Sequence, residues 1–469
     1  MALRRLVSVL GACAALAGCG GGGDDAAATT TTAAAPAPAP APRLTPTACG
    51  DLPGFRCARL AVPLHRRGPR AQDGRRLTLD VAIQRGDRGP RGDLVLLTGG
   101  PGQPARAFGP RMLRRLGDAL RGYRLVLLDQ RGTGADALRC DALQRAVGSS
   151  DLTVPPRAAV LACAQTLGDD RDAYATADTV EDLDALRAAL GDERWVLAGV
   201  SYGTFVALRY ALAHPRATRG LVLDSVVPQQ GVELLERVPL RATARVLRAV
   251  CRGEAAPCAG DPADDLAALL RRRPALGPEV FDALTALSIG VPQLARIPAL
   301  LHRARHGDVA PLRAQLTAVR RAEAAPAQLL SQGLHAATLC ADSPAPWGGP
   351  QAGEAARAAA LTRARAALRP ADTAPYPPST AFGQGLLLTC RWWPPVAAPP
   401  APAPGPVRAP ALLVNGDRDL STPLEWARAQ ARAMPRARLF VVGGAGHSVL
   451  SRDTGNRARP VLRAFLQRL

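Results

Sequence analysis

The sequence predicts an α/β fold in which a mostly parallel, doubly wound sheet is interrupted by an inserted helical cap. Two observations lead to this prediction. Short apolar runs alternate with amphipathic stretches through the first half of the chain, which is the pattern of a doubly wound sheet. This alternation lapses after Pro228, where a long region rich in Ala, Leu and Arg has few strand signals, and it resumes near residue 411.

The predicted strands are of two kinds. Residues 77–83 alternate between apolar and polar side chains, as a half-buried edge strand does. The other runs are continuously apolar, as central parallel strands buried on both faces are. They lie at residues 94–97, 125–128, 195–198, 221–223, 411–414 and 439–442. Helical spacing of apolar residues predicts helices over 179–190 and 457–468.

These patterns divide the chain into successive regions. We predict a lipoprotein signal peptide at 1–18, a Gly/Ala/Pro tether at 19–44, the first part of the sheet domain at 45–228, the helical cap at 229–393, a proline-rich connection at 394–410 and the second part of the sheet domain at 411–469.

The amino terminus predicts export. Two arginines precede a short apolar stretch, residues 6–17, which is too short to span a bilayer as a mature helix. The stretch ends in Leu-Ala-Gly-Cys19, which resembles the bacterial lipobox and implies a lipid attached to Cys19. We therefore expect a bacterial protein anchored through Cys19 to the outer face of the cell membrane, or held in the periplasm. An ordinary signal peptide, with Cys19 incidental, is the alternative.

The formal charge is +20, yet the sequence gives little reason to expect a nucleic-acid partner. All 59 basic residues are arginine and no lysine occurs, which is typical of a GC-rich coding bias. The arginines are scattered, and no nucleic-acid recognition motif accompanies them. We therefore predict no nucleic-acid partner.

The cysteines predict disulfides. Of ten cysteines, Cys13 lies in the signal peptide and Cys19 is the lipid site, which leaves an even number for an oxidising compartment. Proximity along the chain favours pairing of neighbours: Cys49 with Cys57, Cys140 with Cys163, Cys251 with Cys258, and Cys340 with Cys390. No Cys-x-x-Cys occurs, so we predict neither a zinc site nor another metal or cofactor.

A Gly-x-Ser-x-Gly motif follows the predicted strand at 195–198. The serine is Ser201, between Gly199 and Gly203. A sharp turn between a strand and a helix needs small flanking residues and lifts the serine above the sheet, where it can act as a nucleophile. We predict that Ser201 is the nucleophile.

A serine hydroxyl needs a neighbouring base. Of the six histidines, only His447 follows a late strand on a glycine-rich loop, and we predict that it is the base. His302 and His306 share a helix face, but the glutamate of a His-Glu-x-x-His zinc motif is absent. His335 lies in the predicted cap, where packing is the default role.

The base needs an orienting acid, and the chain order nucleophile, acid, base places it before His447. Asp417 and Asp419 both satisfy this order, and position alone does not separate them.

The oxyanion of the tetrahedral intermediate needs two backbone N–H donors. We expect the amide of Tyr202 and that of Gly100, with Gly99 close behind, because glycines let the backbone approach closely.

Together these segments resemble the secreted tripeptidyl-aminopeptidase (TAP-like) branch of the α/β-hydrolase serine peptidases, which is related to the proline iminopeptidases. The resemblance rests on four motifs and extends over about residues 45–469. The motifs are Gly99-Gly100-Pro101-Gly102, Asp129-Gln130-Arg131-Gly132-Thr133-Gly134, the serine turn, and Gly416-x-x-Asp419-x-x-Thr422-Pro423. The last motif places the acid at Asp419. The surroundings of Cys340 and Cys390 also resemble the family pattern.

Two departures affect the predicted site. Thr98 stands where the glycine loop of the family begins with histidine, and Ala135-Asp136 replaces its x-Ser. Neither change removes a triad residue, but both alter loops close to the expected substrate site.

The resemblance implies an exported serine hydrolase of the α/β-hydrolase fold that releases short peptides from free amino termini. A carboxylate in the cap is then expected to bind the substrate amine, and the candidates are Glu233, Glu236, Glu323 and Asp342. A carboxylesterase or lipase with the same triad is the main alternative, because fold and serine turn do not select amide over ester. A lipid-anchored binding protein without catalysis is a further alternative.

Overall fold

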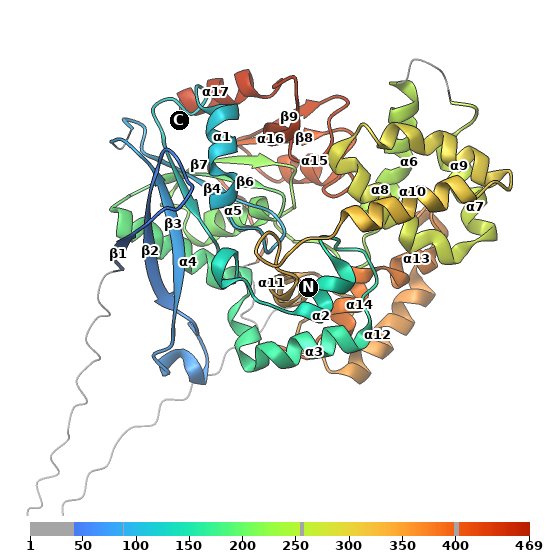
Figure 1. Cartoon of the computed structure of the whole chain (residues 1–469), viewed down its shortest axis with the longest axis horizontal. Coiled ribbons are helices and arrows are strands. Elements are labelled where there is room, and N and C mark those ends of the chain that lie inside the picture. The colour runs from blue at the N-terminus through green and yellow to red at the C-terminus, as the bar shows by residue number, and fades with distance from the viewer. Residues whose placement is uncertain (1–41, 88, 254–257, 398–402) are drawn as a thin grey trace, which may run out of the picture. The chain divides into compact units, whose positions relative to one another are not determined.

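Nine strands form one sheet in the part of the chain that the computed structural model describes, residues 42–87, 89–253, 258–397 and 403–469 (Figure 1). The strand order is β1-β2-β3-β5-β4-β6-β7-β8-β9. The strands β1 to β3 are antiparallel to their neighbours, and β5, β4, β6, β7, β8 and β9 run parallel to one another. The predicted α/β fold with a mostly parallel sheet is confirmed.

The strand bounds follow the apolar runs of the sequence closely. They are β1 Leu44–Thr47, β2 Phe55–Pro63, β3 Arg76–Gln84, β4 Asp93–Leu97, β5 Arg124–Leu128, β6 Trp195–Val200, β7 Thr218–Asp224, β8 Ala411–Gly416 and β9 Ala437–Val442. Strands β1 and β2 were not predicted from the sequence. The prediction that residues 77–83 form an edge strand is wrong, because β3 pairs with both β2 and β5.

Helices cover both faces of the sheet. Alternate residues of one strand point to opposite faces, so Val95 and Leu97 of β4 pack with helices α4, α5 and α15, whereas Leu94 and Leu96 pack with α1, α16 and α17. The bounds of these helices are α1 Gly109–Leu116, α4 Thr176–Leu190, α5 Tyr202–Ala213, α15 Leu424–Arg432, α16 Val449–Arg452 and α17 Arg459–Arg468. Burial on both faces explains why the parallel strands are continuously apolar.

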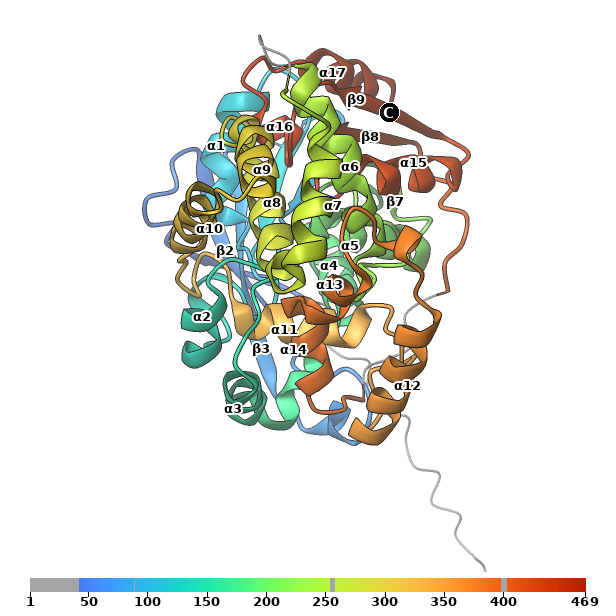
Figure 2. The same cartoon turned by 90° about the vertical axis from the view of Figure 1, so that its right-hand side faces the viewer.

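The remaining helices lie outside the sheet layers, with α2 Asp141–Val147 and α3 Arg157–Leu167 preceding α4 along the chain. Between β7 and β8 follow α6 Arg237–Arg252, α7 Pro262–Arg272, α8 Gly277–Gly290, α9 Ile297–Arg305, α10 Ala310–Ala322, α11 Gln332–Asp342, α12 Glu354–Ala367, α13 Pro378–Gly383 and α14 Gly385–Trp392. We call this group, α6 to α14, the cap. Most of its apolar residues form a core cluster of their own, and Figure 2 shows α6 to α9 side by side.

The four predicted disulfides are present. Cys49 bonds to Cys57 and so joins the loop after β1 to β2, and Cys140–Cys163 joins the start of α2 to α3. Cys251–Cys258 joins the last turn of α6 to the residues before α7, and Cys340–Cys390 joins α11 to α14. The predicted signal peptide and Cys19 lie outside the described residues. Within the described chain, no helix combines the length and apolar composition that crossing a membrane requires.

Candidate active site

Ser201 occupies a tight turn between β6 and α5. Its φ is 56°, in the left-handed region that non-glycine residues rarely adopt. A Cβ atom on Gly199 would lie 2.4 Å from the carbonyl oxygen of Gly203, and one on Gly203 would lie 2.3 Å from that of Leu97. The turn therefore requires glycine on both sides of the serine, as the sequence motif predicts.

The structure brings Asp419 and His447 together. Asp419 is fully buried in the loop after β8, and its Oδ2 lies 2.9 Å from Nδ1 of His447, in the loop after β9. The backbone amide of Thr422 donates to Oδ1 of Asp419 (2.9 Å), and the Thr422 hydroxyl donates to Oδ2 (2.7 Å). These bonds hold the carboxylate in place, and His447 and Ser201 line the same cavity.

Asp417, the other candidate acid, has a different partner. Its Oδ1 accepts a hydrogen bond from the amide of Gly444 (2.7 Å), in the loop that carries His447. Asp417 thus braces the histidine loop, whereas Asp419 contacts the imidazole itself.

Burial and charge act on His447 in opposite directions. Burial lowers the pKa of the imidazole, but the charge and hydrogen bond of Asp419 outweigh it and raise the pKa above its ordinary value of 6.5. A basic imidazole held in one orientation is suited to take a proton from a serine hydroxyl.

The predicted oxyanion loop lies against the serine. A Cβ atom on Gly99 would lie 3.0 Å from the Cβ of Ser201 and 3.4 Å from its Oγ, so a side chain at this position would crowd the serine. Gly100, with φ 100°, also needs glycine. Tyr202 is the first residue of α5, where backbone N–H groups have no partner within the helix. Thr98, which replaces the family's histidine, donates to the carbonyl of Gln103 (2.7 Å) and so braces this loop.

Two cavities meet at Ser201. The larger has a volume of about 140 Å³, and the smaller of about 40 Å³. Both are lined by Gly100, Asp151, Ser201 and Ser421. The larger cavity also includes His447 and several apolar side chains, namely Leu96, Phe108, Met112, Val200, Ile289 and Leu330.

The smaller cavity is acidic. Glu236, at the start of cap helix α6, and Asp342, at the end of α11, line it together with Asp151. Burial raises the pKa of Glu236 well above its ordinary value, and the charges of Asp151 and Glu233 add to this effect. Burial also raises the pKa of Asp342 to about 6, although a hydrogen bond from the Thr176 amide opposes the shift.

The other two candidate carboxylates do not line either cavity at Ser201. Glu233 forms an ion pair with Arg237 (2.6 Å) on α6. Glu323 lines a separate cavity near Asp282 and Arg320. The structure therefore brings Glu236 and Asp342 to the serine and leaves Glu233 and Glu323 apart from it.

Asp151 was not predicted as a site residue, because it lies in an irregular loop ahead of the predicted cap. Its Oδ1 lies 3.1 Å from Nε2 of His335, and Nδ1 of His335 lies 3.0 Å from the carbonyl oxygen of Pro101. His335 thus links the acidic cavity to the oxyanion loop, in addition to the packing role that the sequence suggested. Within the described residues, no three His, Cys, Asp or Glu side chains are grouped as a metal ion would need.

The end of β7 holds the histidine loop. The buried carboxylate of Asp224 accepts hydrogen bonds from the amides of Val449 (2.9 Å) and Leu450 (2.8 Å), and Oγ of Ser225 accepts one from the amide of Ser448 (2.7 Å). Burial raises the pKa of Asp224 to about 6. No motif marks these residues, although their place at a parallel strand end is where such contacts are expected.

A model of the α/β hydrolase fold family matches residues 94–453. The probable proline iminopeptidase of Streptomyces coelicolor is 36% identical over 140 residues, which are 30% of this chain and 34% of that protein. The tripeptidyl aminopeptidase of Streptomyces lividans is 30% identical over 191 residues, or 37% of this chain and 35% of that protein. The matched part thus spans about a third of the length of these curated relatives.

Among solved structures, proline iminopeptidase from Mycobacterium smegmatis aligns over 91% of this chain and 98% of its own, at 15% identity and a TM-score of 0.39. The names of the sequence relatives are those of the two peptidase groups that the motifs resemble.

Proposed function

The chain belongs to the α/β hydrolase fold family, and from this premise we propose that it is an exported serine hydrolase that releases short peptides, of the tripeptidyl type, from free amino termini. Ser201 attacks the scissile carbonyl while His447 accepts the hydroxyl proton and then donates it to the leaving amine. Water next hydrolyses the acyl-enzyme. Asp419 orients the imidazole, and the amides of Tyr202 and Gly100, or Gly99, stabilise the oxyanion.

The acidic cavity beside Ser201 carries the aminopeptidase proposal. Glu236 is 6% exposed and forms no ion pair with a described arginine or histidine. A buried carboxylate without a counter-charge is unfavourable, and the ammonium of a peptide would supply that charge. Asp342 and Asp151 line the same cavity and would share the cation.

The test compares kcat/KM for a tripeptide anilide with a free amine and for its acetylated form. Acetylation removes a hydrogen bond to a charged group, so kcat/KM should be roughly ten- to hundredfold higher for the free amine. Glu236→Gln should reduce this preference. Glu233→Gln is the matched control, because Glu233 lies on the same segment but pairs with Arg237 and does not line the cavity. A ratio near one in the unaltered protein would reject the aminopeptidase function. Aminoacyl, dipeptidyl and tripeptidyl anilides with free amines test the length preference.

The apolar wall of the larger cavity favours a second candidate, a carboxylesterase or lipase with the same triad. Such an enzyme would hydrolyse short-chain esters faster than any anilide and would not discriminate against acetylated substrates.

A binding protein without catalysis would not react with a fluorophosphonate. We expect labelling of the unaltered protein and none of Ser201→Ala.

Export and anchoring rest on the lipobox-like sequence before Cys19 and on the disulfides, which persist in oxidising compartments. We expect a peptide substrate outside the cytoplasm and no nucleic-acid partner. Metabolic labelling with a fatty acid should mark the full chain, and Cys19→Ser should remove the label. Labelling that persists in Cys19→Ser would place the lipid elsewhere.

A further inference from the structure

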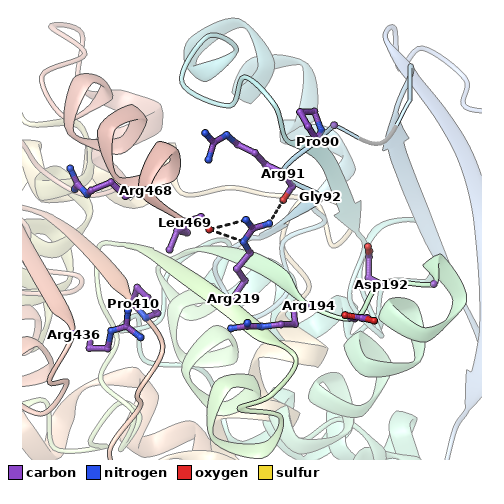
Figure 3. A pocket seen from close by; sticks show the side chains of 13 residues that line it. Pro90, Arg91, Gly92, Asp192, Arg194, Arg219, Pro410, Arg436, Arg468 and Leu469 are labelled. Atoms are coloured by element: carbon purple, nitrogen blue, oxygen red, sulfur yellow. Dashed lines mark hydrogen bonds between the residues drawn. The ribbon is translucent and has the colours of Figure 1, made fainter.

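A further cavity, of about 850 Å³, is lined by residues at the starts of parallel strands (Figure 3). Its lining includes Gly92, Arg194 and Pro410, which directly precede β4, β6 and β8. The loops that carry Ser201 and Asp419 instead follow the ends of β6 and β8. The two sites are thus separated by the length of the strands.

Five arginines line this cavity. They are Arg91, Arg194, Arg219, Arg436 and Arg468. In the sequence they are scattered between residues 91 and 468, but the fold brings their segments together. Within the described chain, none of the five forms an ion pair with an aspartate or glutamate side chain, whereas many other arginines do.

Two of the five arginines build the wall. Arg219 donates to the backbone oxygen of Leu469 (3.1 and 2.8 Å) and to the carbonyl of Arg91 (2.6 Å). The guanidinium of Arg91 in turn donates to the carbonyl of Gln467 (3.0 Å). These bonds fasten the end of α17 to the strand starts, so Arg91 and Arg219 shape the cavity.

The side chains of the other three arginines make few contacts with the rest of the protein and are available to bind a ligand. Arg194 makes one long hydrogen bond, to the carbonyl of Thr218 (3.4 Å). Arg436 and Arg468 are exposed, and the guanidinium group of neither forms a hydrogen bond or ion pair with another described residue. Asp192 and Glu193 also line the cavity, but Figure 3 shows Asp192 on the side away from Arg436 and Arg468. Asp192 is therefore not placed to pair with Arg436 or Arg468.

We propose that this cavity binds a ligand that carries two or more phosphate groups. Guanidinium groups form paired, charge-assisted hydrogen bonds to phosphate oxygens. A single carboxylate would satisfy one guanidinium and leave the others without a partner. Neighbouring phosphates would satisfy Arg194, Arg436 and Arg468 together, and the cavity has room for several such groups.

The first experiment measures binding of tripolyphosphate by calorimetry at low salt, with the full chain carrying Cys19→Ser so that no lipid is attached. The variant that tests the cavity combines Arg194→Gln, Arg436→Gln and Arg468→Gln. Its Kd should rise at least about tenfold, because hydrogen bonds to charged groups are lost, and the dependence of Kd on salt should weaken.

The matched control removes three exposed arginines of the cap instead, Arg241→Gln, Arg272→Gln and Arg363→Gln, with the same change in net charge. This control should bind tripolyphosphate like the unaltered protein. An equal loss in both variants would overturn the proposal, as would an unaltered protein that does not bind. Hydrolytic activity should stay within about twofold in the cavity variant, because the cavity is remote from Ser201.

The second experiment identifies the source of the phosphates. Vesicles containing phosphatidylglycerol are mixed with the same proteins and floated. Binding that is lost in the cavity variant, kept in the control and displaced by tripolyphosphate would assign the site to lipid headgroups. Tripolyphosphate binding without flotation would assign it to a soluble phosphate ligand.

Discussion

The backbone carbonyl of Ser288 accepts a hydrogen bond from the amide of His447 (3.2 Å), so the cap holds the loop that carries the proposed base. Ser288 lies in the last turn of cap helix α8, where carbonyl groups have no partner within the helix. Its hydroxyl accepts a second hydrogen bond, from the amide of Leu420 next to Asp419 (3.0 Å). A Cβ atom on Gly446 would lie 2.0 Å from the Ser288 carbonyl, so this contact also explains the glycine before His447.

The cap also holds the oxyanion loop. The amide of Ser331, just before α11, donates to the carbonyl of Gly102 (3.1 Å), and His335 contacts the carbonyl of Pro101. Cap helices therefore contact all three loops around Ser201, and the position of the cap and the geometry of the site are linked. This link implies that changes in the cap affect the rate of the chemical step as well as substrate binding.

Ser288→Ala tests the link between the cap and the proposed triad. The change removes the acceptor for the Leu420 amide, and a lost hydrogen bond is worth about 0.5–1.5 kcal/mol. We expect kcat to fall by up to about tenfold with a smaller change in KM. Thr243→Val is the control, because Thr243 is an equally buried cap residue whose hydroxyl donates to the carbonyl of Pro239, within α6. Similar kinetics for both variants would contradict the link.

Asp419→Asn should reduce kcat far more than Asp417→Asn. Of the two aspartates, only Asp419 contacts the imidazole, and an amide in its place would favour the wrong tautomer of His447. We expect a loss of about a thousandfold or more for Asp419→Asn. Asp417→Asn keeps an oxygen acceptor for the Gly444 amide and should lose less than about tenfold. Equal losses, measured with one ester substrate, would show that Asp419 does not orient the base.

The value of kcat/KM should increase with pH as His447 titrates, with a pKa above 6.5. His447 acts as a base only when neutral, and although burial lowers its pKa, Asp419 raises it further. We therefore expect kcat/KM to be low at pH 5 and to increase as His447 loses its proton. An ester without an amine is the substrate, so that titration of a substrate ammonium does not contribute. Residual activity of Asp419→Asn should rise at lower pH than that of the unaltered protein. An unchanged midpoint in this variant would contradict the prediction.

The residues proposed for catalysis were predictable because their chemistry leaves local signals. Glycines flank Ser201 for steric reasons that any such turn shares, and His447 follows a late strand on a loop in which Gly444 has a positive φ and Gly446 packs against Ser288. Continuous apolar runs predicted the parallel strands, because burial on both faces imposes that pattern. Cys140 and Cys163 lie close in sequence and also in the fold.

Contacts that the tertiary structure creates were not predictable in this way. The alternation in β3 resembles that of an edge strand, yet β2 covers its outer side, and β1 contains only four residues, one of them Pro46. Asp151 and Ser288 enter the site from irregular loops and a helix end, where no periodicity marks a role. The arginine cavity is likewise a product of folding alone.

Glu323→Gln should stabilise the protein at alkaline pH. Burial and the charge of Asp282 raise the pKa of Glu323 to about 8, although Arg320 opposes the shift. Between 4.5 and that value the folded state binds more protons than the unfolded state, so stability falls as pH rises through this window. The variant should match the unaltered protein near pH 4.5 and exceed it at pH 8.5 by roughly 1–3 kcal/mol in free energy of unfolding. Glu354→Gln, at an exposed carboxylate, should have no such effect.

The disulfide Cys340–Cys390 should stabilise the protein more than Cys251–Cys258. The first bond closes a separation of 50 residues between α11 and α14, and the second a separation of 7. Loop-closure entropy predicts losses of about 4 and about 2 kcal/mol, respectively, when each pair is replaced by serine. Denaturant unfolding measures both losses of stability, and thiol titration of the denatured, unreduced protein checks that the disulfides exist.

Because Asp342 lies two residues after Cys340, the Cys340→Ser/Cys390→Ser variant should also lose affinity for a substrate amine. Equal stability of the two variants, or several free thiols in the unaltered protein, would contradict the prediction.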